Sequence, residues 1–380
     1  MTARDAAFLD NWTLQDVAHA LARGLSPTRI KTIRLDGERD THEWDTAPEA
    51  AIQVECLLDL MLDLVLRESV TIEEAYAHTW RVEGTVLNNI QEAGHILTTT
   101  VQPQDDRIKA KKRVLVDDFC ATESLRKVQR ENEVSFARTQ KSVHEHEGAL
   151  LWGTAGNLAR AAALGLVHSA HPYRRRLMEQ TTFPVARPDV VRGTVEWVQR
   201  ERTRLMQQLS PGSDRRMAVV ELPPIVTELI LGSERPEDLL LNAVQARQEY
   251  RRLRTWLGEY QTAMDEQDPR ALAKHQKTLD AVARDLARLT GSSPSGSTAL
   301  SLNVGFFGLS LPVPELFDRA SSWFGVRADF NRLLTSKRND DALDKLLGMF
   351  GERETSLGRD VRRHFQARAT DTLLSTGGAS

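Results

Sequence analysis

The sequence has few cysteines, few aromatic residues and no long apolar run. Only Cys56 and Cys120 occur among 380 residues, which excludes a disulfide framework and a four-cysteine zinc site. Aromatic residues make up 6% of the chain, which favours helices over an aromatic-rich β-sandwich. Residues 1–10 contain three charged side chains and no apolar stretch, so we expect no signal peptide. These absences predict a cytoplasmic protein without a membrane span.

The short motifs of the common enzyme classes are missing as well. There is no Gly-x-Ser-x-Gly, no His-Glu-x-x-His and no set of kinase motifs. Residues 153–156 read Gly-Thr-Ala-Gly, but the rest of a phosphate-binding fingerprint is not there, so we expect these small residues to allow close helix packing. Catalytic groups from distant helices leave no local motif, so the sequence leans against an enzyme without deciding the question.

The charge is distributed unevenly along the chain. Residues 1–100 contain 8 Lys and Arg against 17 Asp and Glu, whereas the remainder has a net charge of +6. Such a difference can steer a charged partner. The basic part is nevertheless far from the strongly basic composition of a dedicated nucleic-acid binder.

The spacing of apolar residues predicts a mainly α fold, built as a multi-helix bundle. Residues 48–68 would be apolar on nearly every side of a helix, which predicts a central, buried one. Thr13 and Thr71 each begin a four-residue stretch like a capping box, so we expect a helix to start at each. Further helices are predicted over residues 104–146, 149–166 and 171–179.

A longer apolar pattern lies in the second half of the chain. From Leu239 to Met264 the apolar residues alternate spacings of four and three, as in a heptad seam. The same spacing returns from Leu272 to Leu289, after a turn expected at Asp268-Pro269. We therefore predict a coiled-coil-like antiparallel helical hairpin over residues 236–290.

Little β structure is expected. Residues 30–44 resemble a small hairpin whose turn is Asp36-Gly37, because this pair supplies the positive φ angles of a tight turn. Residues 299–313 are uncharged and alternate in polarity, which predicts a second strand or hairpin. A Ser-, Gly- and Pro-rich linker precedes them at 292–298. The chain is thus predicted to have three regions: an acidic-start helical region 1–181, a region 187–291 with the helical hairpin, and a small C-terminal region 299–380.

Histidines and carboxylates supply candidate metal ligands. One Glu-x-x-His motif is present, whereas carboxylate metal sites in helical bundles use two. Four more histidines lie close together in sequence, but two of them are two residues apart and would diverge by about 200° on a helix. Because neither set is complete, no cofactor is expected. The candidate ligands are Glu92, His95, His144, His146, His168 and His171.

Residues 55–67 carry a narrow charged stripe, with Glu55, Asp59, Asp63 and Arg67 four apart on the otherwise apolar helix. Three interpretations remain: a carboxylate metal site, a solvated edge of the helix, or internal ion pairs in which Asp63 and Arg67 are neighbours on the helix.

Clusters of arginine are candidates for contacts with the phosphates of a nucleic acid. Acidic residues interleave with each cluster, and a charged helical surface often serves solubility alone. The candidates are Arg174, Arg175, Arg176, Arg247, Arg251 and Arg254.

The leading hypothesis for function is a non-catalytic helical adaptor or assembly subunit that acts through protein–protein contacts. The heptad seam and the uncharged segment are features of partner surfaces, and Phe306 and Phe307 are the interaction-surface candidates. A protein partner is therefore expected, and a homo-oligomer is compatible with the pattern. The second hypothesis is a nucleic-acid-binding protein that uses the arginine faces, and the third is a helical metal-dependent enzyme.

Overall fold

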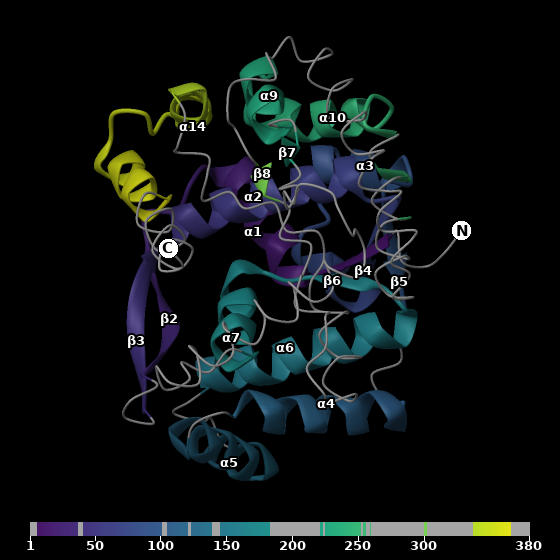
Figure 1. The fold of residues 1–380 in the computed structure, drawn as a ribbon, viewed down its shortest axis with the longest axis vertical. Coiled ribbons are helices and arrows are strands. Elements are labelled where there is room, and N and C mark those ends of the chain that lie inside the picture. The colour runs from purple at the N-terminus through teal and green to yellow at the C-terminus, as the bar shows by residue number, and fades with distance from the viewer. Residues whose placement is uncertain are drawn as a thin grey trace, which may run out of the picture.

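A sheet of four parallel strands runs through the middle of the computed structural model (Figure 1). The strand order is β5-β4-β1-β6, and β1 pairs in parallel with both β4 and β6. The strands are β1 Ala6–Leu9, β4 Ser69–Glu73, β5 Ile96–Thr99 and β6 Val167–Ser169. The structure describes residues 6–36, 41–100, 105–120, 123–138, 145–182, 221–222, 225–251, 254–255, 259, 300–301 and 337–365.

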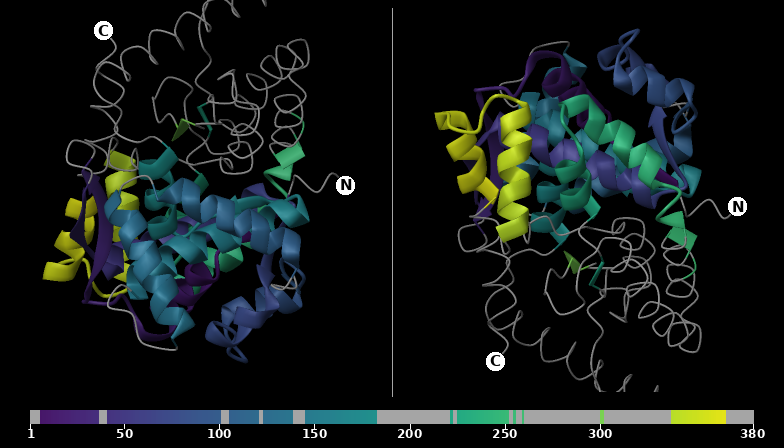
Figure 2. Two further views of the ribbon diagram at one scale, coloured as in Figure 1. Left: turned by 90° about the horizontal axis from the view of Figure 1, so that it is seen from below. Right: turned by 90° about the horizontal axis from the view of Figure 1, so that it is seen from above.

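Helices cover both faces of this sheet (Figures 1 and 2). One face is covered by α1 (Asn11–Arg23) and α2 (Glu49–Leu66), with α9 (Ile225–Gly232) and α10 (Pro236–Ala246) beyond them. The other face is covered by α6 (Glu145–Leu164), with α4 (Asp106–Phe119) and α5 (Glu123–Ala137) outside it. This is a Rossmann-like α/β arrangement, so the predicted mainly α bundle is wrong.

The remaining elements connect or flank these layers. The 3₁₀ helix η2 (Glu74–Thr79) and α3 (Val86–Glu92) lead from β4 to β5, and α7 (Pro172–Thr182) follows β6. Near the C-terminus, α14 (Lys337–Met349) packs on α9, and a last helix covers residues 356–365. A separate two-stranded pair joins β7 (Glu221–Leu222) to β8 (Leu300–Ser301).

The strands of the central sheet are short and largely buried, which is why the helical interpretation failed. Thr71 lies inside β4, paired with Phe8 on one side and Leu97 on the other, and does not start a helix. In β4 the four residues after Ser69 are all buried. A short apolar run with both faces buried has no period that separates it from a turn of buried helix.

Helix α2 is the central, buried helix that the sequence predicts. It begins after Pro48, and every residue in it except Glu49 and Asp59 is buried. The helix α1 also forms, but Asp10 caps it instead of Thr13, and it ends at Gly24, whose φ is 81°. Glycine adopts this positive φ without the strain that a Cβ would add.

The coiled-coil prediction is wrong for the part of the seam that the structure describes. Leu239, Ala243 and Ala246 are buried, but α10 packs against α2 and α9 as a helix of the α/β unit. The helix α10 ends at Ala246, and a turn over residues 247–250 interrupts the seam before residue 251, which is helical again. Apolar residues spaced four and three apart mark any helix with one buried face, so the pattern does not distinguish the two packings. The second arm, residues 270–290, lies outside the described residues.

A hairpin does occur near the predicted 30–44 segment. It joins β2 (Arg29–Asp36) to β3 (Thr41–Pro48), and Asp36 pairs with Thr41. Asp36 is therefore paired within the strands, so the tight turn predicted at Asp36-Gly37 is wrong, and residues 37–40 lie outside the described residues. Of residues 299–313 the structure describes only the two in β8, so Phe306 and Phe307 lie outside the described part.

A single hydrophobic cluster joins all these layers. It extends from Leu9 at the end of β1 through α2 to Leu239 of α10 and Phe365 of the last helix. Within the described part of the chain, no helix has the length and apolar character that crossing a lipid bilayer requires.

Candidate ligand site at the switch point of the sheet

The chain reverses its direction of travel across the sheet at β1. From β1 it moves to β4 and then β5 on one side, and it returns later to place β6 on the other side. The loops that follow β1 and β6 therefore separate at the carboxyl edge between these two strands. In open parallel sheets, this topological switch point is where ligands bind.

Asp10 occupies this edge directly after β1, and its side chain is fully buried. Its Oδ1 accepts a hydrogen bond of 3.1 Å from the backbone N–H of Trp12, which caps α1. Its Oδ2 accepts two more, from Asn157 Nδ2 at 3.0 Å and from Arg174 Nη1 at 3.1 Å. The carboxylate thus joins β1 to α6 and α7.

The same neighbours keep Asp10 charged. Burial acts to raise the pKa of the carboxyl group, but the Arg174 guanidinium and the nearby His168 more than offset this effect. The pKa of Asp10 consequently lies well below its ordinary value. His168 Nε2 is 3.8 Å from Asp10 Oδ2, and both side chains are completely inaccessible to solvent.

Arg174 is held in place from three sides. Its guanidinium is bonded to Asp10, and it also lies over the Trp12 ring, 3.9 Å from the ring centroid. On its far side is Gly153 of α6, where a Cβ would be only 2.7 Å from Nη2. The absence of a side chain at Gly153 therefore makes room for the buried guanidinium.

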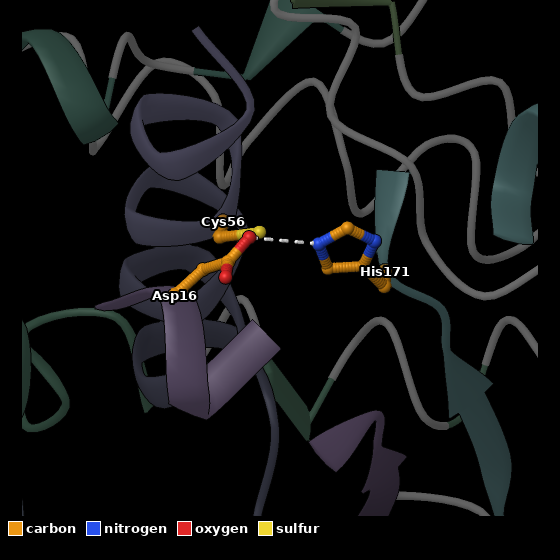
Figure 3. Close-up of side chains that lie close together, drawn as sticks. All are labelled: Asp16, Cys56 and His171. Atoms are coloured by element: carbon orange, nitrogen blue, oxygen red, sulfur yellow. Dashed lines mark hydrogen bonds and ion pairs between the residues drawn. The ribbon is translucent and has the colours of Figure 1, made fainter. Parts of the chain in front are cut away.

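A second group of side chains lies on the α2 side of the same loops (Figure 3). Asp16 of α1, Cys56 of α2 and His171 after β6 bring one potential ligand atom each to within 4.8 Å of one another. His171 Nε2 is 3.0 Å from Asp16 Oδ2. Burial, and secondarily the Asp16 carboxylate, raises the pKa of the Cys56 thiol well above its ordinary value.

The hydrogen bonds of His171 bear on whether this group would hold a metal. Its Nδ1 accepts the backbone N–H of Tyr173 at 3.3 Å, so Nε2 carries the ring proton and donates it to Asp16. A metal-bound imidazole uses a bare nitrogen for the metal and donates from the other. In His171 the nitrogen that faces Asp16 carries the proton and the other nitrogen accepts, which is the reverse of a metal-bound imidazole. Cys56, whose thiol pKa is raised, would also have to lose its proton to bind a metal. The group therefore fits a hydrogen-bonded cluster better than a metal site.

The charged stripe on α2 turns out to be the partner of the arginines on α7. Arg175 contacts Asp59 at 2.7 Å and Glu55 at 3.2 Å. Arg67 lies 3.6 Å from Asp63, whose Oδ2 also accepts the hydroxyl of Ser169. Internal ion pairing, one of the three interpretations of this stripe, is what the structure shows.

Several buried polar atoms around this edge have no hydrogen-bond partner among the described residues. They belong to the first turn of α1, to β6 and to the beginning of α7, which are the segments that meet at the switch point. Native proteins leave few such atoms, because each unpaired buried group is costly. The atoms are Thr13 Oγ1, His168 Nδ1, Tyr173 OH and Arg174 Nε.

The other predicted metal ligands that the structure describes do not join this site. Glu92 is exposed and accepts a hydrogen bond from Asn88, and His95 is half-buried. His146 is exposed on α6, and His144 lies outside the described residues. Of the five candidates that the structure describes, only His168 and His171 lie at the switch point.

The predicted nucleic-acid-binding arginines divide into two groups. Arg174 and Arg175 are engaged as described above, and Arg176 contacts Glu55 at 3.8 Å. Arg247 and Arg254 instead donate to backbone carbonyls at the end of α2. Arg251 is exposed to solvent. Binding of nucleic acid by these residues stays a prediction.

Sequence reasoning missed Asp10, Asp16 and Cys56 as members of the site. The local signal for Asp10 is its position directly after the apolar stretch Ala6–Leu9, since polar residues after a buried parallel strand lie at the ligand-binding edge. That signal has meaning only once residues 6–9 are assigned to a strand. Asp16 and Cys56 have no local signal, because their partner His171 is far away in sequence.

Compared with known proteins, the chain matches no protein-family model, no curated protein and no solved structure. Interpretation of the site therefore rests on its geometry and its chemistry.

Proposed function

We propose that the protein binds a small-molecule ligand at the carboxyl edge of its parallel sheet, between β1 and β6. The observation that carries this proposal is the gathering of unpartnered, buried polar atoms at the switch point. Thr13 and Arg174 contribute such atoms from the segments that follow the two strands. A ligand with both donors and acceptors would satisfy groups that otherwise destabilise the fold.

The surroundings of these atoms support a preformed site. Trp12 is only half-buried, and Arg174 and His171 fix its ring, the latter edge-on at 5.6 Å between ring centroids. Asp10 is bonded to Arg174 and Asp16 is bonded to His171, and both of these partners follow β6. Rigid side chains around a partly exposed aromatic ring are the usual composition of a small-molecule site.

Thermal melts with and without ligands test the proposal. Nucleotides, sugar phosphates, dicarboxylates and amino acids would each be added at millimolar concentration, and a true ligand at 100 times its Kd should add about 2.7 kcal/mol of stability. The diagnostic variant is Thr13→Val, which keeps the shape of the side chain and removes the unpartnered hydroxyl. We expect it to melt at or above the wild-type temperature without ligand, and to lose most of the ligand-induced shift.

Thr227→Val is the matched control, because Thr227 is equally buried but lies on α9, away from the sheet edge. It should keep the full ligand-induced shift. The proposal fails if no compound class stabilises the wild type, or if Thr13→Val and Thr227→Val respond identically to the ligand.

The adaptor hypothesis stays a prediction beside this proposal. Of the features on which it depends, the described part of the first arm packs inside the α/β unit, whereas the second arm, Phe306 and Phe307 lie outside the described residues.

A further inference from the structure

Next to the switch point, basic side chains outnumber the acidic side chains that pair with them. Arg160 of α6 forms an ion pair with Glu73 at the end of β4, with 2.8 Å between Nε and Oε2. Arg174 is balanced by Asp10. Lys112 of α4 has no ion pair with any described acidic side chain, and its Nζ lies 4.8 Å from the centroid of the Trp152 ring.

Two of these cations lie close to Gly156. A Cβ at this position would be 3.4 Å from Arg160 Nη1 and 3.7 Å from Lys112 Nζ. The pKa of Lys112 lies below its ordinary value, first because burial disfavours the ammonium group and then because Arg160 and Arg174 are close. Like charges in a partly buried region repel each other unless an anion lies between them.

The excess positive charge lies beside the hydrogen-bond network of Asp10. Arg160 Nη1 also donates to Asn157 at 3.3 Å, and Asn157 is the residue that bonds Asp10. The cations thus continue the Asp10 network along α6 toward α4. Trp152 and Arg160 are both partly exposed, with 12% of the Arg160 side chain accessible, so this end of the network has some contact with solvent.

We propose that Lys112 and Arg160 bind a phosphoryl group of the ligand, beside the Gly156 backbone of α6. This inference rests on the proposed function and specifies the ligand class, a phosphorylated small molecule. A phosphoryl group supplies the missing negative charge and several acceptor oxygens for the ammonium and guanidinium donors. The aromatic ring of Trp152 on α6 lies beside this position, with its centroid 4.8 Å from Lys112 Nζ, and it suits the uncharged part of such a ligand.

Pyrophosphate is the probe for this test, with isothermal titration calorimetry and thermal melts as the readouts. Lys112→Gln removes the charge and keeps a polar side chain of similar reach. We expect it to weaken pyrophosphate binding about tenfold or more, the usual effect of losing one charge-assisted bond. Without pyrophosphate, Lys112→Gln should melt at or above the wild-type temperature, because it relieves repulsion.

Lys111→Gln is the control, since Lys111 is exposed on the same helix. It should change pyrophosphate affinity by less than about twofold, as a distant surface charge does. The inference is overturned if the wild type does not bind pyrophosphate, or if Lys112→Gln lowers the melting temperature and leaves the affinity unchanged. Binding of a DNA or RNA oligonucleotide in place of pyrophosphate would overturn the small-molecule assignment.

The two proposals fail in different ways. An unphosphorylated ligand whose stabilising effect depends on Thr13 and is unchanged in Lys112→Gln would leave the proposed function intact and refute the phosphoryl site. Loss of pyrophosphate binding in Lys112→Gln alone supports the phosphoryl site, even when Thr13→Val has no effect.

Discussion

Asp10 and Arg174 form a buried ion pair across 164 residues of sequence, with 3.1 Å between Oδ2 and Nη1. One residue follows β1 and the other lies in the first turns of α7, so the pair closes the carboxyl edge of the sheet at its switch point. Both side chains are almost inaccessible to solvent, and each is the main counter-charge of the other.

Removing one partner of this ion pair should strongly lower the free energy of unfolding. Asp10→Asn leaves the Arg174 guanidinium buried without its counter-charge, so we expect a loss of about 3–5 kcal/mol in urea unfolding. Asp344→Asn is the control, because its pair with Arg362 is far more exposed and should contribute about 0–1 kcal/mol. Equal losses in the two variants would show that the buried Asp10 pair stabilises the fold no more than the exposed Asp344 pair does.

The stabilisation by Asp10 should depend on pH in a defined direction. Its folded-state pKa lies below the ordinary value of 3.8, so the unfolded chain takes up this proton first as the pH falls. The contribution is complete at neutral pH and is lost progressively below about 3.8. The difference in unfolding free energy between wild type and Asp10→Asn should therefore narrow in acid. A difference that stays constant down to the acid unfolding transition would contradict this assignment.

The buried helix α2 and the reading of its charged stripe show what could be predicted from local sequence. A segment of 18 residues with apolar side chains on nearly every side of the helix favours a central, buried helix, and the four-residue spacing of Asp63 and Arg67 made their ion pair predictable. These inferences need only neighbours along one helix.

The sheet and the site could not be predicted in the same way. The strand β6 has three residues and β1 has four, which is too short for an alternating pattern to appear. His171 and Arg174 were among the candidates, but Asp16 is 155 residues from His171 in the chain. Only the parallel pairing of β1 with β6 brings such partners together, and that pairing was not visible from the sequence.

The two cysteines should be unreactive in the native protein. Cys56 is fully buried with its thiol pKa raised, and burial raises the pKa of Cys120 to about 12. Because the thiolate is the reactive form, neither should react with a disulfide reagent at pH 8 until denaturant is added. Added Co²⁺ should likewise give no thiolate-to-metal absorption band. Rapid native labelling of Cys56, or a cobalt–thiolate band, would show that the Asp16–Cys56–His171 group is more open than its hydrogen bonds indicate.

Arg247 should contribute strongly to stability through the end of α2. Its guanidinium donates to the carbonyls of Leu64, Arg67 and Glu68, which have no partner within the helix. Arg247→Met should cost about 3 kcal/mol, because hydrogen bonds to charged groups contribute about 1.5–3 kcal/mol each. Arg251→Met, an exposed neighbour, should stay within about 0.5 kcal/mol. Chemical denaturation of both variants gives the comparison, and a costlier Arg251→Met would reverse the assignment.

The two glycines of α6 should respond in opposite directions to the same substitution. Gly153→Ala would place a Cβ 2.7 Å from Arg174 Nη2, and this guanidinium cannot retreat easily because Asp10 and Trp12 hold it. Overpacking of this kind costs about 1–3 kcal/mol, more than alanine gains over glycine in a helix. At Gly156 the nearest atom would be 3.4 Å from the new Cβ, so alanine should stabilise the helix by up to about 1 kcal/mol.

Thermal unfolding of Gly153→Ala and Gly156→Ala tests this pair, because both positions share one helix and one unfolded-state effect. The difference between the two variants isolates the contact with Arg174 from the propensity of the backbone. Adding Arg174→Met to Gly153→Ala removes the group that obstructs the new methyl, so the glycine substitution should then cost far less than it does alone. If Gly153→Ala is as stable as Gly156→Ala in the presence of Arg174, the guanidinium has room to move, and Gly153 is not what holds it against Trp12.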